Sequence, residues 1–137
     1  MVVCDDRSKY NKIREFIKEK KVEITTLNTF MPYLSNKNIA LMKLDVEGHE
    51  LRVLKGGKEL ITKYHVPFIV LEYSPTITKY IGDNARDLAQ LLVDNGYKIS
   101  LNGFLSKDYI TVDELVNKAG FQVNCYFIHS SIINSFN

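Results

Sequence analysis

One stretch of sequence decides the fold of this chain: Leu41-Met42-Lys43-Leu44-Asp45-Val46-Glu47-Gly48-His49-Glu50. An apolar run ends there in three carboxylates, a glycine and a histidine. A continuous apolar run is typical of a buried parallel strand, and ligands of open α/β sheets bind just beyond the carboxyl ends of such strands. We therefore expect a buried strand over Asn38–Leu44 and a functional site directly after it.

The segments on either side of this strand have patterns of their own. Before it, apolar spacing predicts a short amphipathic helix within residues 12–20, and alternation predicts an edge strand at Val22–Leu27. After it, a helical face is interrupted by the pair Gly56-Gly57. A glycine inside a helix costs about 1 kcal/mol relative to alanine, so we expect a break or an unusually close approach of another segment at this pair.

The rest of the chain alternates between strands and helices. The expected elements are a buried strand at Phe68–Leu71, a helix between Asn84 and Asn95, a strand at Tyr97–Leu101, a short helix opened by the capping box Thr111–Glu114, and a last strand at Phe121–His129. Right-handed crossovers make the strands at 38–44, 68–71 and 97–101 parallel. The final connection is too tight for a crossover, so the last strand should run antiparallel. This is an α/β, Rossmann-like, doubly wound and mostly parallel pattern.

Length and composition place the chain in an ordinary class. Its 137 residues fit a single domain, 1–137, and a net charge of +2 gives no argument for a nucleic-acid partner. The two cysteines, Cys4 and Cys125, form neither a metal-binding spacing nor a disulfide framework, so we expect a reduced, cytoplasmic setting. No apolar run approaches the roughly 18 residues that a membrane-spanning helix needs, and we expect no membrane partner.

The polar residues at the strand ends are the candidate site. Asp45, Glu47 and His49 could orient a substrate, accept a proton or, through the carboxylates, bind a hard divalent cation. The two acids could instead cap the helix that follows, since carboxylates at a helix N-terminus accept hydrogen bonds from free N–H groups. Glu72 ends the next buried strand, where an acid is seldom placed without a partner. Either a substrate or a nearby lysine could be that partner.

The run Leu44–Leu51, followed by Val53-Leu54-Lys55-Gly56-Gly57 and by a strand that ends in Glu72, resembles the FkbM-type methyltransferase family. The resemblance is strongest over residues 27–74, after the N-terminal helical segment at 1–21. It implies a class I methyltransferase fold that uses S-adenosylmethionine and methylates a hydroxyl group of a small molecule or a glycan. It also implies catalytic roles for Asp45, Glu47, His49 and Glu72, with Asp45 and Val46 at the cofactor.

One expected feature of that family does not match. The seven glycines contain no G-x-G arrangement, which is the usual way for a backbone to approach such a cofactor closely. The chain therefore resembles the C-terminal half of the domain, as a truncated or partial form. The alternative is a non-catalytic Rossmann-like remnant that forms a homo-oligomer through an exposed sheet edge, because unpaired edges invite strand pairing.

Overall fold

The computed structural model describes residues 23–34 and 37–133. In chain order, its elements are the 3-10 helix η1 (Leu27–Phe30), α2 (Met31–Leu34), β1 (Leu41–Leu44), α3 (Glu50–Gly56), α4 (Lys58–Thr62), β2 (Phe68–Tyr73), α5 (Pro75–Tyr80), α6 (Ala85–Asp94), β3 (Tyr97–Ser100), α7 (Val112–Lys118), β4 (Val123–His129) and α8 (Ser130–Ile133). None of these helices is long and apolar enough to span a membrane.

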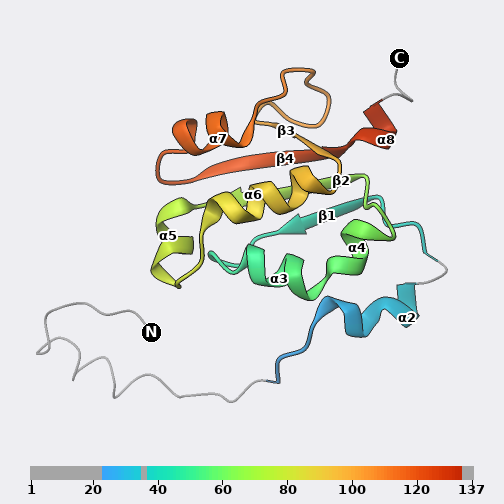
Figure 1. Cartoon of the computed structure of the whole chain (residues 1–137). Helices are drawn as coiled ribbons and strands as arrows, with labels where there is room; N and C mark the ends of the chain where they lie inside the picture. The colour runs from blue at the N-terminus through green and yellow to red at the C-terminus, as the bar shows by residue number, and fades with distance from the viewer. Residues whose placement is uncertain (1–22, 35–36, 134–137) are drawn as a thin grey trace, which may run out of the picture.

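The four strands form one mixed sheet in the order β1-β2-β4-β3 (Figure 1). β1 and β2 are parallel, while β4 is antiparallel to both of its neighbours, β2 and β3. β1, β2 and β3 therefore run in the same direction, as the crossover rule predicts, and the expected antiparallel final strand is confirmed. β4 lies between β2 and β3, so the last strand in sequence occupies an interior position in the sheet.

The register of the parallel pair brings two candidate acids to the same edge. Leu44 of β1 pairs with Leu71 of β2. The residue after Leu44 is Asp45, just past β1, and the residue after Leu71 is Glu72, near the end of β2. Parallel strands present their carboxyl ends on one side of a sheet. The parallel pairing of β1 with β2 therefore brings the two strand ends close together.

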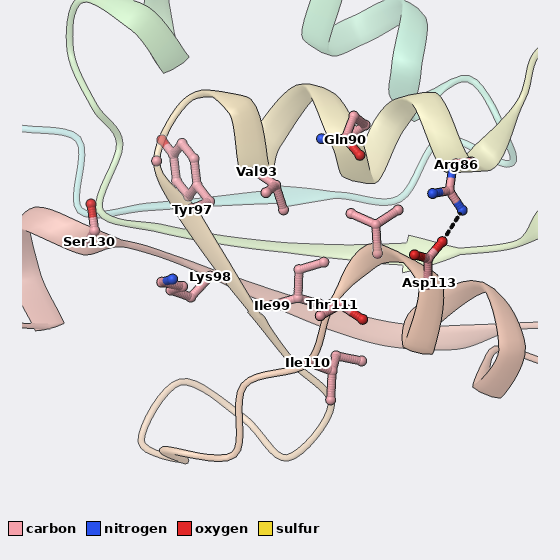
Figure 2. Close-up of a pocket in the computed structure, with 12 residues that line it drawn as sticks. Arg86, Gln90, Val93, Tyr97, Lys98, Ile99, Ile110, Thr111, Asp113 and Ser130 are labelled. Carbon is pink, nitrogen blue, oxygen red and sulfur yellow. Dashed lines mark ion pairs between the residues drawn. The ribbon is translucent and has the colours of Figure 1, made fainter.

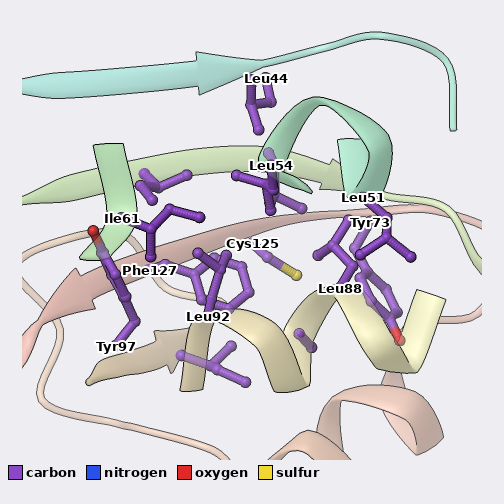
Figure 3. Close-up of a cluster of buried hydrophobic side chains, with 14 of the residues drawn as sticks. Leu44, Leu51, Leu54, Ile61, Tyr73, Leu88, Leu92, Tyr97, Cys125 and Phe127 are labelled. Atoms are coloured by element: carbon purple, nitrogen blue, oxygen red, sulfur yellow. The ribbon is translucent and has the colours of Figure 1, made fainter. Parts of the chain in front are cut away.

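Alternation along the strands directs one face of the sheet into the core. Ile69, Leu71 and Tyr73 of β2 are buried, whereas the residues between them are half-buried. Figure 3 shows Leu54 of α3, Ile61 of α4 and Leu92 of α6 in the same apolar cluster as Phe127 of β4. Figure 1 shows these three helices on one side of the sheet. The α/β class is established, but a doubly wound arrangement, with helices on both faces, is not confirmed.

The expected edge strand at Val22–Leu27 is wrong over its described part. Residues 23–26 have no regular structure, and Leu27 begins the 3-10 helix η1. Alternating β-branched residues form a strand only where a neighbouring strand offers backbone partners. Here Thr26 and Leu27 pack instead against the connection between α3 and α4. The helix expected within 12–20 lies outside the described residues.

The glycine pair confirms the expected break and explains it. α3 ends at Gly56 and α4 begins at Lys58, with Gly57 between them. A Cβ atom on Gly57 would lie 2.9 Å from Leu27 Cδ1, and one on Gly56 would lie 3.3 Å from Thr26 Cβ. Thr26, just before η1, and Leu27, the first residue of η1, therefore occupy the space that side chains at positions 56 and 57 would fill.

This close approach gives a stability prediction. Gly57→Ala should lower the free energy of unfolding by about 1–3 kcal/mol, because the added methyl group overlaps the Leu27 side chain. Combining it with Leu27→Ala should recover part of that loss, and urea unfolding of the two single variants and the double variant measures the coupling. Additive effects of the two substitutions would contradict the proposed contact.

Candidate functional site

The loop after β1 turns sharply before α3 begins. Glu47 has φ 51° and Gly48 has φ 92°, so two consecutive residues are in the left-handed region. For a residue other than glycine this conformation is strained by roughly 1–2 kcal/mol, and such strain collects at functional sites. A Cβ on Gly48 would lie 2.7 Å from Ile77 Cγ2 of α5, so only glycine fits this part of the turn.

The turn leaves the predicted side chains of the loop accessible. Asp45, Glu47 and His49 are exposed, and Val46 is half-buried. Asp45 accepts a hydrogen bond from Lys43 Nζ at 3.0 Å, in an ion pair that is largely open to solvent. Pairs of this kind contribute about 0–1 kcal/mol, so Asp45 can exchange its lysine for another partner at little cost.

The helix that follows the loop has no side-chain cap at its N-terminus, so neither Asp45 nor Glu47 caps it. His49 is the N-cap of α3, and its side chain makes no cap hydrogen bond. Glu50 instead turns back to the loop, where its Oε1 accepts from Val46 N–H at 3.1 Å and from Gly48 N–H at 3.4 Å. Only 1% of Glu50 is exposed. The sequence pattern placed Glu50 in the first turn of a helix, where acids are common, and gave no signal of its burial.

Glu72 has an amide as its partner. The half-buried carboxylate accepts a hydrogen bond from Gln122 Nε2, just before β4 begins. The lysine salt bridge, one of the two alternatives for Glu72, is not formed among the described residues, and its partner there is the neutral amide of Gln122, next to the start of β4. The orientation of the Glu72 carboxylate thus depends on the pairing of β2 with β4.

Two further buried groups lie where β2 ends. Tyr73 is 1% exposed, and burial, together with the Cys125 thiol, raises its pKa to about 12, so it stays protonated. Ser74 follows it as the N-cap of α5, but its hydroxyl makes no cap hydrogen bond. Ser74 Oγ and Glu50 Oε2 are the buried side-chain oxygens that lack a hydrogen-bond partner within residues 23–34 and 37–133.

A cavity of about 410 Å³ adjoins this strand end. Its lining includes Tyr73 and Pro75 together with the charged or polar residues Lys79, Asp83, Asn84 and Arg86. α3 is tied to this region because Arg52 donates to Asp83 Oδ2 at 2.5 Å and to the Ile81 carbonyl at 2.7 Å. The residues around α5 were not among the sequence-based candidates, since the Pro75–Tyr80 segment was not expected to be helical.

A second cavity, of about 480 Å³, lies away from the acidic loop. Figure 2 shows it between α6, β3 and α7, with Arg86 paired to Asp113 at one end and Ser130 at the other. Neither of the two cavities is lined by a residue of the β1–α3 loop or by Glu72. Within the described ranges, no group of three His, Cys, Asp or Glu side chains could hold a metal ion.

The fold and its edge define an α/β protein with acids at the ends of two adjacent parallel strands. Comparison with protein-family models matched the methyltransferase FkbM domain over residues 3–99, which is more than half of the chain. The chain therefore belongs to the FkbM methyltransferase family, as its resemblance predicts. The match includes the acidic loop, both parallel strands and β3 up to Ile99. Comparisons with curated proteins and with solved structures gave no match.

The other two histidines lie at the opposite end of the sheet. His129 ends β4 and is buried, with its ring centroid 4.7 Å from that of His65 and 5.0 Å from that of Tyr97. A histidine at a strand end is more often a surface residue, but His129 is buried. Burial, and then the neighbouring His65 imidazole, lower the pKa of His129 below its usual 6.5.

A lowered histidine pKa predicts loss of stability in acid. The unfolded chain binds a proton at His129 near pH 6.5, before the folded chain does, so stability should fall as the pH drops below that value. Thermal unfolding at pH 7.5 and pH 5.0 measures the change. His65→Asn, which keeps a residue tolerant of the positive φ at this position, should make the pH dependence smaller. An equal pH dependence in both proteins would contradict the coupling.

Proposed function

We propose that this chain carries the acceptor side of an S-adenosylmethionine-dependent methyltransferase that methylates a hydroxyl group of a small molecule or a glycan. The observation that carries the proposal is the register of β1 and β2, which brings Asp45 and Glu72 to the same edge inside the family-matched region. Methylation of a hydroxyl needs an acceptor oxygen that is held in place and a group that accepts its proton.

The exposed loop residues suit the proton-accepting role. A carboxylate or a neutral imidazole can take the hydroxyl proton if it reaches hydrogen-bond distance of the oxygen, and Asp45, Glu47 and His49 are all open to solvent. Asp45 is our first choice because it lies directly at the strand end and its partner, Lys43, is exchangeable. The hydroxyl proton would pass to the Asp45 carboxylate as the oxygen displaces the sulfonium sulfur from the methyl carbon, which would leave S-adenosylhomocysteine.

Glu72 suits an orienting role. Its carboxylate is held by Gln122, and a carboxylate has acceptor capacity for more than one donor. A hydroxyl group next to the reacting one on a sugar could donate to it. The cavity beside Tyr73, with its mixture of Lys79, Asp83 and Arg86, has the size of a small-molecule site and polar groups that match the hydroxyls of a glycan.

The proposal includes S-adenosylmethionine as the methyl donor. S-adenosylmethionine supplies an electrophilic methyl group when it is bound, and the family match supports its use. Asp45 could accept from its hydroxyl or amino groups, and the Val46 side chain could contact its adenine. The glycines at 48, 56 and 57 do not form a cofactor cradle, because Ile77, Thr26 and Leu27 fill the space beside them.

An activity measurement on matched variants tests the proposal. When S-adenosylmethionine and a mixture of hydroxyl acceptors are added, the chain should transfer a labelled methyl group to an acceptor. Asp45→Asn should reduce turnover by about 100-fold and unfold at the same urea concentration as the wild type. Asp108→Asn, an exposed acid in the loop between β3 and α7, should leave turnover unchanged. No change in calorimetry or melting at millimolar cofactor would exclude independent activity of this chain.

A non-catalytic module is the second candidate, and one observation favours it. β1 is at the end of the sheet order and pairs only with β2 among the described strands, so no described strand covers its outer edge, where a second copy of the chain could pair. Exposed Lys43 on this strand opposes such pairing, since charged residues on an edge discourage it.

Sedimentation of the chain distinguishes a monomer from a dimer formed through β1. A stable dimer that is lost in Leu41→Pro supports assembly through β1, and a monomer at high concentration excludes it.

A further inference from the structure

Glu50 is an acid in an unusual environment. It is the first residue of α3, a position at which carboxylates normally remain in water, yet only 1% of it is exposed. One of its oxygens, Oε1, receives two backbone N–H groups, and the other, Oε2, receives none within the described residues. Burying a carboxylate that is only partly hydrogen-bonded opposes folding. Its presence therefore needs a reason other than stability.

The two N–H groups belong to the loop that carries the candidate acids. Val46 and Gly48 lie on either side of Glu47, the residue with a left-handed backbone. On the other side of the loop, Gly48 packs against Ile77 and the Thr78 backbone of α5. The turn is therefore held between the Glu50 carboxylate and α5, and its strained backbone cannot relax without breaking one of these contacts.

The direction of the neighbouring side chains follows from that turn. Asp45 directly precedes the peptide that carries the Val46 N–H group, and Glu47 directly precedes the peptide that carries the Gly48 N–H group, so a different backbone conformation of the turn would change the direction of both side chains. Ser74, the other buried group with an unpartnered oxygen, lies at the end of the adjacent strand β2. Unsatisfied buried polar groups at one edge of a sheet are expected where function, rather than stability, determines the residues.

We propose that Glu50 is a positioning residue: its buried carboxylate holds the Val46–Gly48 turn and thereby aims Asp45 and Glu47 at the acceptor. Its catalytic consequence rests on the proposed methyl transfer, but the structural part does not. Glu50 itself would contact neither the acceptor nor the cofactor. Asp45 and Glu47, which it positions, would contact the acceptor.

The first experiment is independent of activity. In the labelled wild-type chain, a scalar coupling through the hydrogen bond should join the Val46 amide nitrogen to the Glu50 side-chain carboxyl carbon. Hydrogen exchange at the Val46 and Gly48 amides should accelerate at least tenfold in Glu50→Ala and much less in Glu50→Gln, which keeps an oxygen acceptor. Glu59→Gln, in the first turn of α4, is the matched control and should change neither amide.

Two results of this experiment would overturn the positioning role. One is the absence of the coupling in the wild type, and this test does not require any variant to fold. The other is wild-type exchange at Val46 and Gly48 in a folded Glu50→Ala protein. Either would show that the turn does not depend on the carboxylate.

The second experiment separates positioning from simple structural support. At a temperature where all variants are folded, Glu50→Ala should lower kcat about tenfold with KM for S-adenosylmethionine within twofold of the wild type, and Glu50→Gln, which keeps the acceptor oxygen, should retain most of the wild-type kcat. Glu59→Gln should match the wild type. Unchanged kcat in a Glu50→Ala protein whose loop amides exchange faster would overturn the proposal. If the wild type transfers no methyl group, the proposed function fails, and the exchange experiment alone decides the role of Glu50.

Discussion

The parallel pairing of β1 with β2 is the constraint on which the candidate site depends. Leu44, the last residue of β1, pairs with Leu71, and the next residues are Asp45, just past β1, and Glu72, which lies one residue before the end of β2. A slip of one residue would move every side chain of β1 to the opposite face, burying Lys43 and exposing Leu44. The core therefore maintains the register, and the register maintains the position of the two acids. Stability and site geometry come from the same contacts.

The sequence pattern predicted the elements best where local chemistry was strong. The Thr111 capping box, the Asn84 cap of α6 and the break at the glycine pair are all present in the structure. Each depends on residues close together in sequence, whose side chains or missing side chains determine the backbone directly. The apolar run of β2 was equally clear, because three of its residues face the core. The buried strand expected over Asn38–Leu44 is wrong in extent and burial: β1 covers Leu41–Leu44, and only Leu44 is buried, because the strand lies at the edge of the sheet.

Predictions that depended on distant partners were less successful. The alternation at Val22–Leu27 resembles a strand, yet its described part packs on Gly56 and Gly57 and forms no sheet. The position of β4 between β2 and β3 depends on long-range pairing that no local pattern reports. For the same reason, the burial of Glu50 and of His129 could not be read from the chain, since it depends on packing in the folded protein, which for His129 includes the ring of His65.

The candidate site shows the same division. Asp45, Glu47, His49 and Glu72 were found from strand ends and family resemblance, whereas Glu50 and Ser74 required three-dimensional packing to be noticed. The most direct test of the account is to record amide chemical shifts of the labelled chain while S-adenosylmethionine and a hydroxyl acceptor are added. The account predicts that the largest changes fall on Asp45–His49 and Glu72–Ser74. Changes confined to the Arg86–Asp113 cavity, or no changes at all, would contradict it.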